Sequence, residues 1–83
     1  MRLIRIQEAL TERTVPFEYS EEDGCGSLDF LFRGIPYHIW EFRDGDTYGV
    51  ETNIFNPGRS VDIEGDYEEK IAELISGWPL MLC

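Results

Sequence analysis

The chain has 83 residues, of which seventeen are acidic and seven are basic, so its formal net charge is −10. This length excludes a second domain, and a hydrophobic content of 42% is enough for a core in one domain, residues 1–83, which argues against intrinsic disorder. The negative charge and the lack of a basic patch argue against direct binding to nucleic acid or to an anionic membrane. No segment approaches the roughly 20 apolar residues of a membrane span, and the charged start lacks the apolar run of a signal peptide, so we expect a cytoplasmic protein.

The beginning of the chain predicts a helix and then an edge strand. The helix, over residues 2–13, is indicated by apolar residues at helical spacing, namely Leu3, Ile6 and Leu10. Pro16 follows the helix, and the residue before a proline is disfavoured in the helical conformation. Phe17 and Tyr19 alternate with polar residues, which predicts a short strand at a sheet edge, where Pro16 needs no ladder partner.

Three further strands are predicted by alternating residues between turn signals, over residues 27–33, 37–42 and 47–54. The turns between them fall at residues 34–36 and 44–46, which contain glycine. A candidate fifth strand, residues 59–64, follows the turn signal Asn56-Pro57-Gly58.

The last helix begins after Asp66, which we expect to cap it, with Glu69 completing a capping box. Its apolar stripe consists of Tyr67, Ile71, Leu74, Ile75 and Trp78. Gly77 and Pro79 are expected to end it. The apolar tail, Leu80–Cys83, either folds back onto the sheet or meets another chain.

The strand 37–42 is apolar or aromatic on both faces, so its register must be decided from the turns. A three-residue turn at 34–36 places Phe30 opposite Trp40, whereas a two-residue turn places Phe30 opposite Tyr37. We favour the first pairing, because it unites the aromatic residues of three strands in one layer. A three-residue turn at 44–46 likewise places Trp40 opposite Val50.

The order of elements predicts a two-layer α+β domain, with an antiparallel meander sheet of four or five strands and both helices on one sheet face. In the favoured register the helices cover Trp40, and the open face carries apolar and polar side chains together. We expect this face to be an interaction surface, formed by Leu31, Tyr37, Ile39, Glu41, Glu51, Asn53 and Arg59. Arg59 pairs there with Glu41 or Glu51, or else such a pair only holds the loop 55–64 in place.

Candidate chemical groups give no clear catalytic or metal site. Residues 44–49 begin like a calcium loop, but Tyr48 and Phe55 stand at positions that need oxygen ligands, so we expect no metal and no cofactor. His38 is either a hydrogen-bonded structural histidine, which we favour, or a general acid or base. Cys25 lies beside acids that suppress a thiolate, and with Cys83 it is expected to be a free thiol rather than a catalytic group or half of a disulfide.

Five runs of residues, at 25–30, 37–41, 51–53, 58–59 and 65–68, resemble a group of short acidic bacterial proteins of unassigned function. The resemblance covers most of the chain. It implies a compact bacterial cytosolic domain and brings no catalytic residues with it.

We therefore expect a small interaction or regulatory module that acts as a homodimer through its open sheet face or an edge, and we lean against an enzyme. One alternative is a mimic of nucleic-acid charge that binds a basic site on another protein, which the acids between Asp62 and Glu73 suggest. The other is a small enzyme or ligand binder that uses His38, Glu41 or Glu51.

Overall fold

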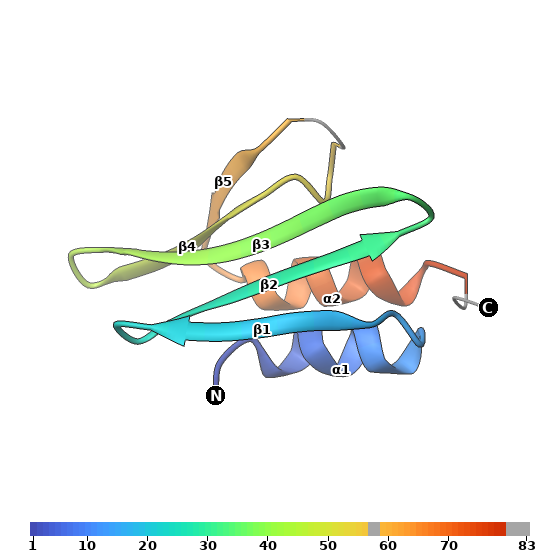
Figure 1. The fold of residues 1–83 in the computed structure, drawn as a ribbon. Coiled ribbons are helices and arrows are strands. Elements are labelled where there is room, and N and C mark those ends of the chain that lie inside the picture. Colours follow the sequence, from blue (N-terminus) through green and yellow to red (C-terminus); the bar gives the residue numbers. More distant parts are fainter. Residues whose placement is uncertain (57–58, 80–83) are drawn as a thin grey trace.

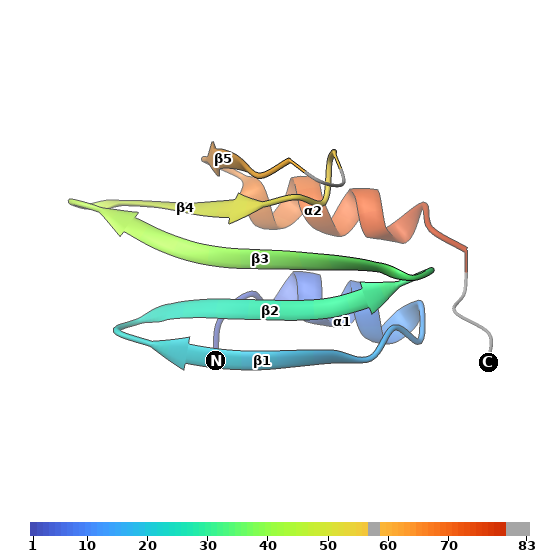
Figure 2. The same cartoon turned by 45° about the horizontal axis from the view of Figure 1, so that its top comes forward.

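A computed structural model describes residues 1–56 and 59–79, which form one sheet covered on one face by two helices (Figures 1 and 2). The five strands are antiparallel and lie in chain order, so the predicted α+β meander is confirmed, with the fifth strand present. The elements are α1 (Ile4–Glu12), β1 (Phe17–Glu22), β2 (Cys25–Phe32), β3 (Ile35–Asp44), β4 (Thr47–Thr52), β5 (Val61–Glu64) and α2 (Tyr67–Ser76). Neither helix, within these described residues, is both long and apolar enough to cross a membrane.

The turn between β2 and β3 has two residues, not the three that we favoured, so Phe30 pairs with Tyr37 and not with Trp40. Its central residues, Arg33 and Gly34, have φ angles of 53° and 81°. Positive φ at both central positions defines the type I′ turn, whose twist matches that of the two strands it joins. This match, together with the glycine at the second position, accounts for the shorter turn.

The turn between β3 and β4 is also one residue shorter than predicted, because Asp44 pairs with Thr47. Trp40 therefore lies opposite Glu51, and Phe42 lies opposite Gly49. Since side chains alternate between the two faces of a strand, a shift of one residue turns β3 over.

In this register Tyr37, Ile39 and Glu41 of β3 point toward the helices. The aromatic side chains of His38, Trp40 and Phe42 lie on the open face. Ile39 is fully buried, whereas Trp40 is 42% exposed. On β4 the predicted facing is confirmed, because Val50 and Thr52 are buried against the helices.

The acids at the start of α2 bind α1 instead of capping their own helix. Asp66 occupies the N-cap position, as predicted, but its side chain makes no capping hydrogen bond. Glu69 pairs with the Arg5 guanidinium at 2.5 Å, and Glu68 Oε1 accepts a hydrogen bond from the Arg5 backbone N–H at 2.9 Å. The first-turn N–H groups of a helix lack partners within it, and Glu68 provides a hydrogen-bond acceptor for one such group of α1. The predicted capping box is wrong for this reason.

An aromatic cluster closes the end of the core beyond α2. The Trp78 ring stacks on Phe32 with centroids 4.2 Å apart, and it also contacts Tyr37 at 5.5 Å. Arg13, at the end of α1, donates a hydrogen bond to the Trp78 carbonyl at 3.2 Å, which ties the two helix ends together. The predicted stripe of α2 thus does face the core, while the tail Leu80–Cys83 lies outside the described residues.

Gly49 on β4 is required because the Phe42 ring lies over it. A Cβ at Gly49 would come within 2.6 Å of Phe42 Cζ and 2.8 Å of the Ile63 carbonyl oxygen. Gly49→Ala is therefore expected to lower the free energy of unfolding by about 2 kcal/mol, measured by urea unfolding. Gly77→Ala is the matched control, because its nearest contact would be an ordinary 3.5 Å. Equal stability of the two variants would contradict this close approach.

Candidate interaction surface

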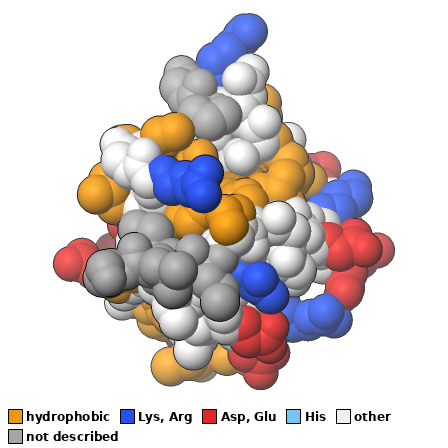
Figure 3. Space-filling model, turned by 90° about the vertical axis from the view of Figure 1, so that its right-hand side faces the viewer, with side chains coloured by type: hydrophobic (Ala, Val, Ile, Leu, Met, Phe, Trp, Pro, Cys, Tyr) orange, Lys and Arg blue, Asp and Glu red, His pale blue; other side chains and the backbone are white. Residues whose placement is uncertain are grey.

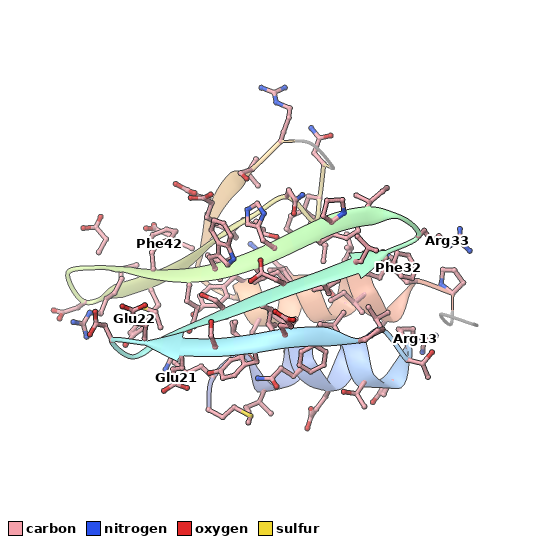
Figure 4. The ribbon with its side chains drawn as sticks, viewed as in Figure 1. Arg13, Glu21, Glu22, Phe32, Arg33 and Phe42 are labelled. Carbon is pink, nitrogen blue, oxygen red and sulfur yellow. The ribbon has the colours of Figure 1, made fainter. Side chains whose placement is uncertain are left out.

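The open face of the sheet, which the helices do not cover, carries an aromatic row along β3 that consists of His38, Trp40 and Phe42. Trp40 is the most exposed of the three at 42%. The His38 ring lies beside the indole, with centroids 4.3 Å apart, and Phe42 follows at the other end, over Gly49 (Figure 4). The sequence predicts this row in the core because the three-residue turn favoured between β2 and β3 gives β3 the wrong facing.

Two contacts hold the Trp40 side chain in place on the open face. Its Nε1 donates a hydrogen bond to Asp29 Oδ1 of β2 at 3.1 Å, and His38 supports one side of the ring. His38 Nε2 in turn lies 3.1 Å from Ser60 Oγ and 3.8 Å from Glu51 Oε2. The indole is thus held in place on the central strand of the sheet while a large part of it stays accessible.

Carboxylates lie directly opposite each other on both sides of the aromatic row. Glu18 pairs with Asp29 between β1 and β2, and Glu51 pairs with Asp62 between β4 and β5. Like charges directly opposite on one sheet face destabilise the sheet. By alternation, the open-face positions of the five described strands carry no lysine or arginine that would offset these pairs. Positive groups bound beside each pair would relieve these repulsions.

A shallow depression of about 440 Å³ adjoins Asp29 on the same face. Leu31 and Pro36 form part of its apolar floor, and Glu18 and Asp29 bring carboxylates to it. Leu31 is 55% exposed, so this part of the predicted surface is confirmed as accessible. The combination suits an aliphatic side chain that ends in a positive charge, because the stem can pack on the floor while the charge meets the acids.

The end of the molecule next to the β2–β3 turn differs in character from the open face. Figure 3 shows hydrophobic side chains gathered there around a Lys or Arg side chain, with other Lys and Arg side chains and the Asp and Glu side chains toward the margin. Arg33 extends beyond the turn, away from the sheet (Figure 4), and Ile35 beside it is 36% exposed. The negative charge is therefore distributed unevenly over the surface.

The remaining predicted site residues divide between the two faces. Glu51 belongs to the open face, and Asn53 bonds β3 beyond the end of β4, accepting from the His38 N–H and donating to the Pro36 carbonyl, both at 3.0 Å. Arg59 is exposed and, in the part of the chain that the structure describes, makes no ion pair with Glu41 or Glu51.

The assignment of Tyr37, Ile39 and Glu41 to the surface is wrong, because the exposed fractions of these residues, backbone included, are 8%, 0% and 8%. The physical reason is the shorter turn at Arg33–Gly34, which points all three side chains toward the helices.

Glu41 is the centre of a buried polar cluster that sequence reasoning missed. Arg2 binds both of its carboxylate oxygens, at 2.7 and 3.0 Å. The Tyr67 hydroxyl donates to Oε2 at 2.5 Å, and the Gly26 N–H donates to Oε1 at 2.8 Å. The Arg2 guanidinium also lies 4.4 Å from the centre of the Tyr48 ring. With four donors on one carboxylate, this cluster is suited to holding the chain together and leaves Glu41 no free acceptor for a substrate.

The surroundings of Glu41 change the pKa of each partner. Burial alone would raise the pKa of Glu41, but the hydrogen bonds from Arg2, Tyr67 and Gly26 outweigh it, so the pKa is lowered. The hydrogen bond to Glu41 raises the pKa of Arg2. Burial and the same carboxylate raise the pKa of Tyr67 to about 12. Near pH 7, Glu41 and Arg2 are therefore charged and the Tyr67 hydroxyl is protonated.

His38, Ser60 and Glu51 bring together the residue types of a hydrolytic triad, but their geometry does not fit one. Both Ser60 Oγ and Glu51 Oε2 face the same nitrogen, Nε2. A triad histidine needs the nucleophile and the carboxylate on opposite ring nitrogens. The arrangement instead orients the ring beside Trp40, which agrees with a structural role.

The other chemical candidates gain no support as sites. Cys25 is a free, half-buried cysteine on β2. Asp44 and Asp46 belong to the β3–β4 hairpin, and the described residues contain no group of three His, Cys, Asp or Glu side chains that could hold a metal ion.

Comparisons of the chain with protein-family models, with curated proteins and with solved structures find no match. Fold and surface together define the class of the molecule: a small α+β domain with an acidic sheet face around an exposed, fixed tryptophan.

Proposed function

We propose that the protein is a cytoplasmic bacterial interaction module that binds a positively charged segment of a partner protein on its open sheet face. The observation that carries the proposal is Trp40, 42% exposed and bonded to Asp29, between two pairs of facing carboxylates. A lysine or arginine over an indole ring is attracted to the face of its π system, and neighbouring carboxylates add to that attraction.

The sign of the charge favours a cationic partner over a second copy of the chain at this face. Two copies joined through their open faces would bring Glu18, Asp29, Glu51 and Asp62 of each protomer near their counterparts. Such like-charge contacts across an interface are unfavourable. The predicted homodimer stays a prediction, and an edge of the sheet suits it better than this face.

Mimicry of nucleic-acid charge is the second candidate, supported by the absence of basic residues from the open-face positions of the described strands. The two proposals assign different roles to Trp40. A charge mimic depends on its carboxylates and is indifferent to the indole, whereas recognition of a cationic side chain requires both.

The test is a titration with the flexible peptide Gly-Arg-Gly-Arg-Gly, followed by isothermal calorimetry and by backbone amide shifts. We expect Trp40→Leu to weaken binding by about fivefold, because the leucine keeps an apolar contact but lacks the π face. Phe55→Leu is the matched control, since Phe55 is similarly exposed at 41% but lies outside the aromatic row. Binding should also weaken strongly in about 1 M salt.

Three outcomes decide between the proposals. Loss of binding in Trp40→Leu but not in Phe55→Leu supports cation recognition. Unchanged binding in Trp40→Leu, with loss in the double variant Glu51→Gln and Asp62→Asn, supports charge mimicry instead. No amide shifts on the open face at any peptide concentration would overturn both.

A further inference from the structure

We propose that the free edge of β1 is a second docking site, which accepts an extended segment of a partner protein as a sixth strand of the sheet. β1 pairs with β2 on one side only and forms the outer edge of the described sheet (Figures 1 and 2). This site shares Glu18 with the open face, but it uses the backbone edge of β1 and does not depend on the function proposed for Trp40.

The hairpin geometry determines which backbone groups face outward along this edge. Asp23 and Gly24 form a two-residue turn, with φ angles of 53° and 76°, so Glu22 and Cys25 flank it as a directly paired couple. A tight turn of this kind closes with hydrogen bonds between the flanking residues, and bonded pairs then alternate along an antiparallel ladder. The N–H and C=O groups of Tyr19 and Glu21 therefore point outward, away from β2.

An apolar groove lies beside this edge, on the helix side of the sheet. It has a volume of about 500 Å³, and Met1, Ile4 and Phe17 contribute its apolar lining. Met1 is 79% and Ile4 42% exposed. A strand paired with β1 would direct every second side chain toward α1 and into this groove. Apolar residues at those positions would remove Ile4 and Phe17 from water.

The charges around the edge identify the partner as basic. Glu8 and Glu12 of α1 line the same groove. Glu18 and Glu22 lie on the opposite side of β1, where they would face the other set of side chains on an added strand, and Figure 4 places Glu21 and Glu22 on opposite sides of the strand. The complementary segment therefore alternates apolar residues toward the groove with Lys or Arg toward Glu18 and Glu22.

A second copy of β1 fits this edge less well than a basic strand does. The strand carries Glu18, Glu21 and Glu22, and pairing two copies would bring six carboxylates to one seam. Charged edges of this kind oppose pairing with an identical strand.

The test uses the peptide Lys-Val-Lys-Val-Lys-Val-Lys and two variants that differ only at the backbone of one position. Glu21→Pro removes the outward N–H, and Glu21→Ala keeps it while losing the same side-chain contacts with Tyr19 and the N-terminus. We expect the proline variant to bind about tenfold more weakly than the alanine variant. In the unmodified chain, exchange of the Tyr19 and Glu21 amide hydrogens should slow about tenfold when the peptide is bound.

A further variant keeps the test informative if proline disturbs the hairpin. Ile4→Lys places a positive charge in the groove at an exposed helix position. It should lower the affinity for the peptide about fivefold. In Trp40→Leu the peptide should still slow the exchange of the Tyr19 amide about tenfold, as in the unmodified chain, which separates this site from the open face. Equal binding by the Glu21 variants and unchanged exchange at Tyr19 would overturn the proposal. Slowed exchange at raised protein concentration without peptide would assign the edge to a second copy instead.

Discussion

Replacing Glu41 with glutamine is expected to lower the free energy of unfolding by about 3 kcal/mol, because removing one partner of a buried ion pair leaves the other without a counter-charge. The Glu41 side chain is only 2% exposed, whereas that of Arg2 is 35% exposed. Arg2 can therefore recover part of its hydration, which keeps the expected loss at the lower end of the range for buried pairs. Glutamine has nearly the same shape, but its amide group brings N–H donors toward Arg2, Tyr67 or Gly26, which are donors themselves.

Urea unfolding at neutral pH measures this loss. Glu51→Gln is the matched control, since it makes the same chemical change on a neighbouring strand at a side chain that is 45% exposed, and it should alter stability by less than about 0.5 kcal/mol. A loss below about 1 kcal/mol in Glu41→Gln would mean that the desolvation of the ion pair cancels its attraction.

The pH dependence of stability provides an independent check on the same cluster. The pKa of Glu41 is lowered in the folded protein, so its contribution is present above the unfolded pKa, near 4.3, and is lost as the pH falls through the folded value. The pKa of Tyr67 is raised from 10.0 to about 12, so its contribution is complete below pH 10 and is lost as the pH rises through about 12. The difference between the unmodified chain and Glu41→Gln should therefore shrink in acid, and Tyr67→Phe should remove part of the alkaline loss.

The sequence predicted the layers of this fold but not the orientation of its central strand. Helical spacing at Leu3, Ile6 and Leu10 is a strong local signal, and all three residues are buried as expected. For the strand 37–42, however, hydrophobicity is similar on both faces, so only the turn lengths decide the facing. Arg33 at a positive φ of 53° is not a residue type that announces a type I′ turn. Asp44-Gly45-Asp46 likewise allows a loop of two or three residues.

The candidate surface was predicted in part for the same reason. Leu31 and Glu51 were assigned to the correct face, because the alternation of β2 and β4 is unambiguous. The favoured register places Trp40 in the core and Glu41 on the surface, and the preference for it rests on uniting the aromatic residues of three strands in one layer. What reverses this preference is Arg2, which lies 39 positions away in the chain and is brought to Glu41 only by the packing of the N-terminal segment. No local pattern contains that contact.

The pair Ile39→Ala and Trp40→Ala tests the orientation of the central strand directly. Ile39 is fully buried on the middle strand, and its truncation leaves a cavity among the core side chains, so we expect a loss of about 3 kcal/mol. Trp40 is the larger side chain, but it is 42% exposed, so its truncation should cost less than about 1 kcal/mol.

Urea unfolding of the two variants under identical conditions gives the comparison, and each variant serves as the control for its neighbour. The three-residue turn predicts the opposite order, with the tryptophan substitution by far the more damaging. An unfolding free energy that stays nearly unchanged in Trp40→Ala would also establish that a folded protein can lack the indole. Any loss of binding to the cationic peptide in that variant would then be due to the missing ring and not to a disturbed sheet.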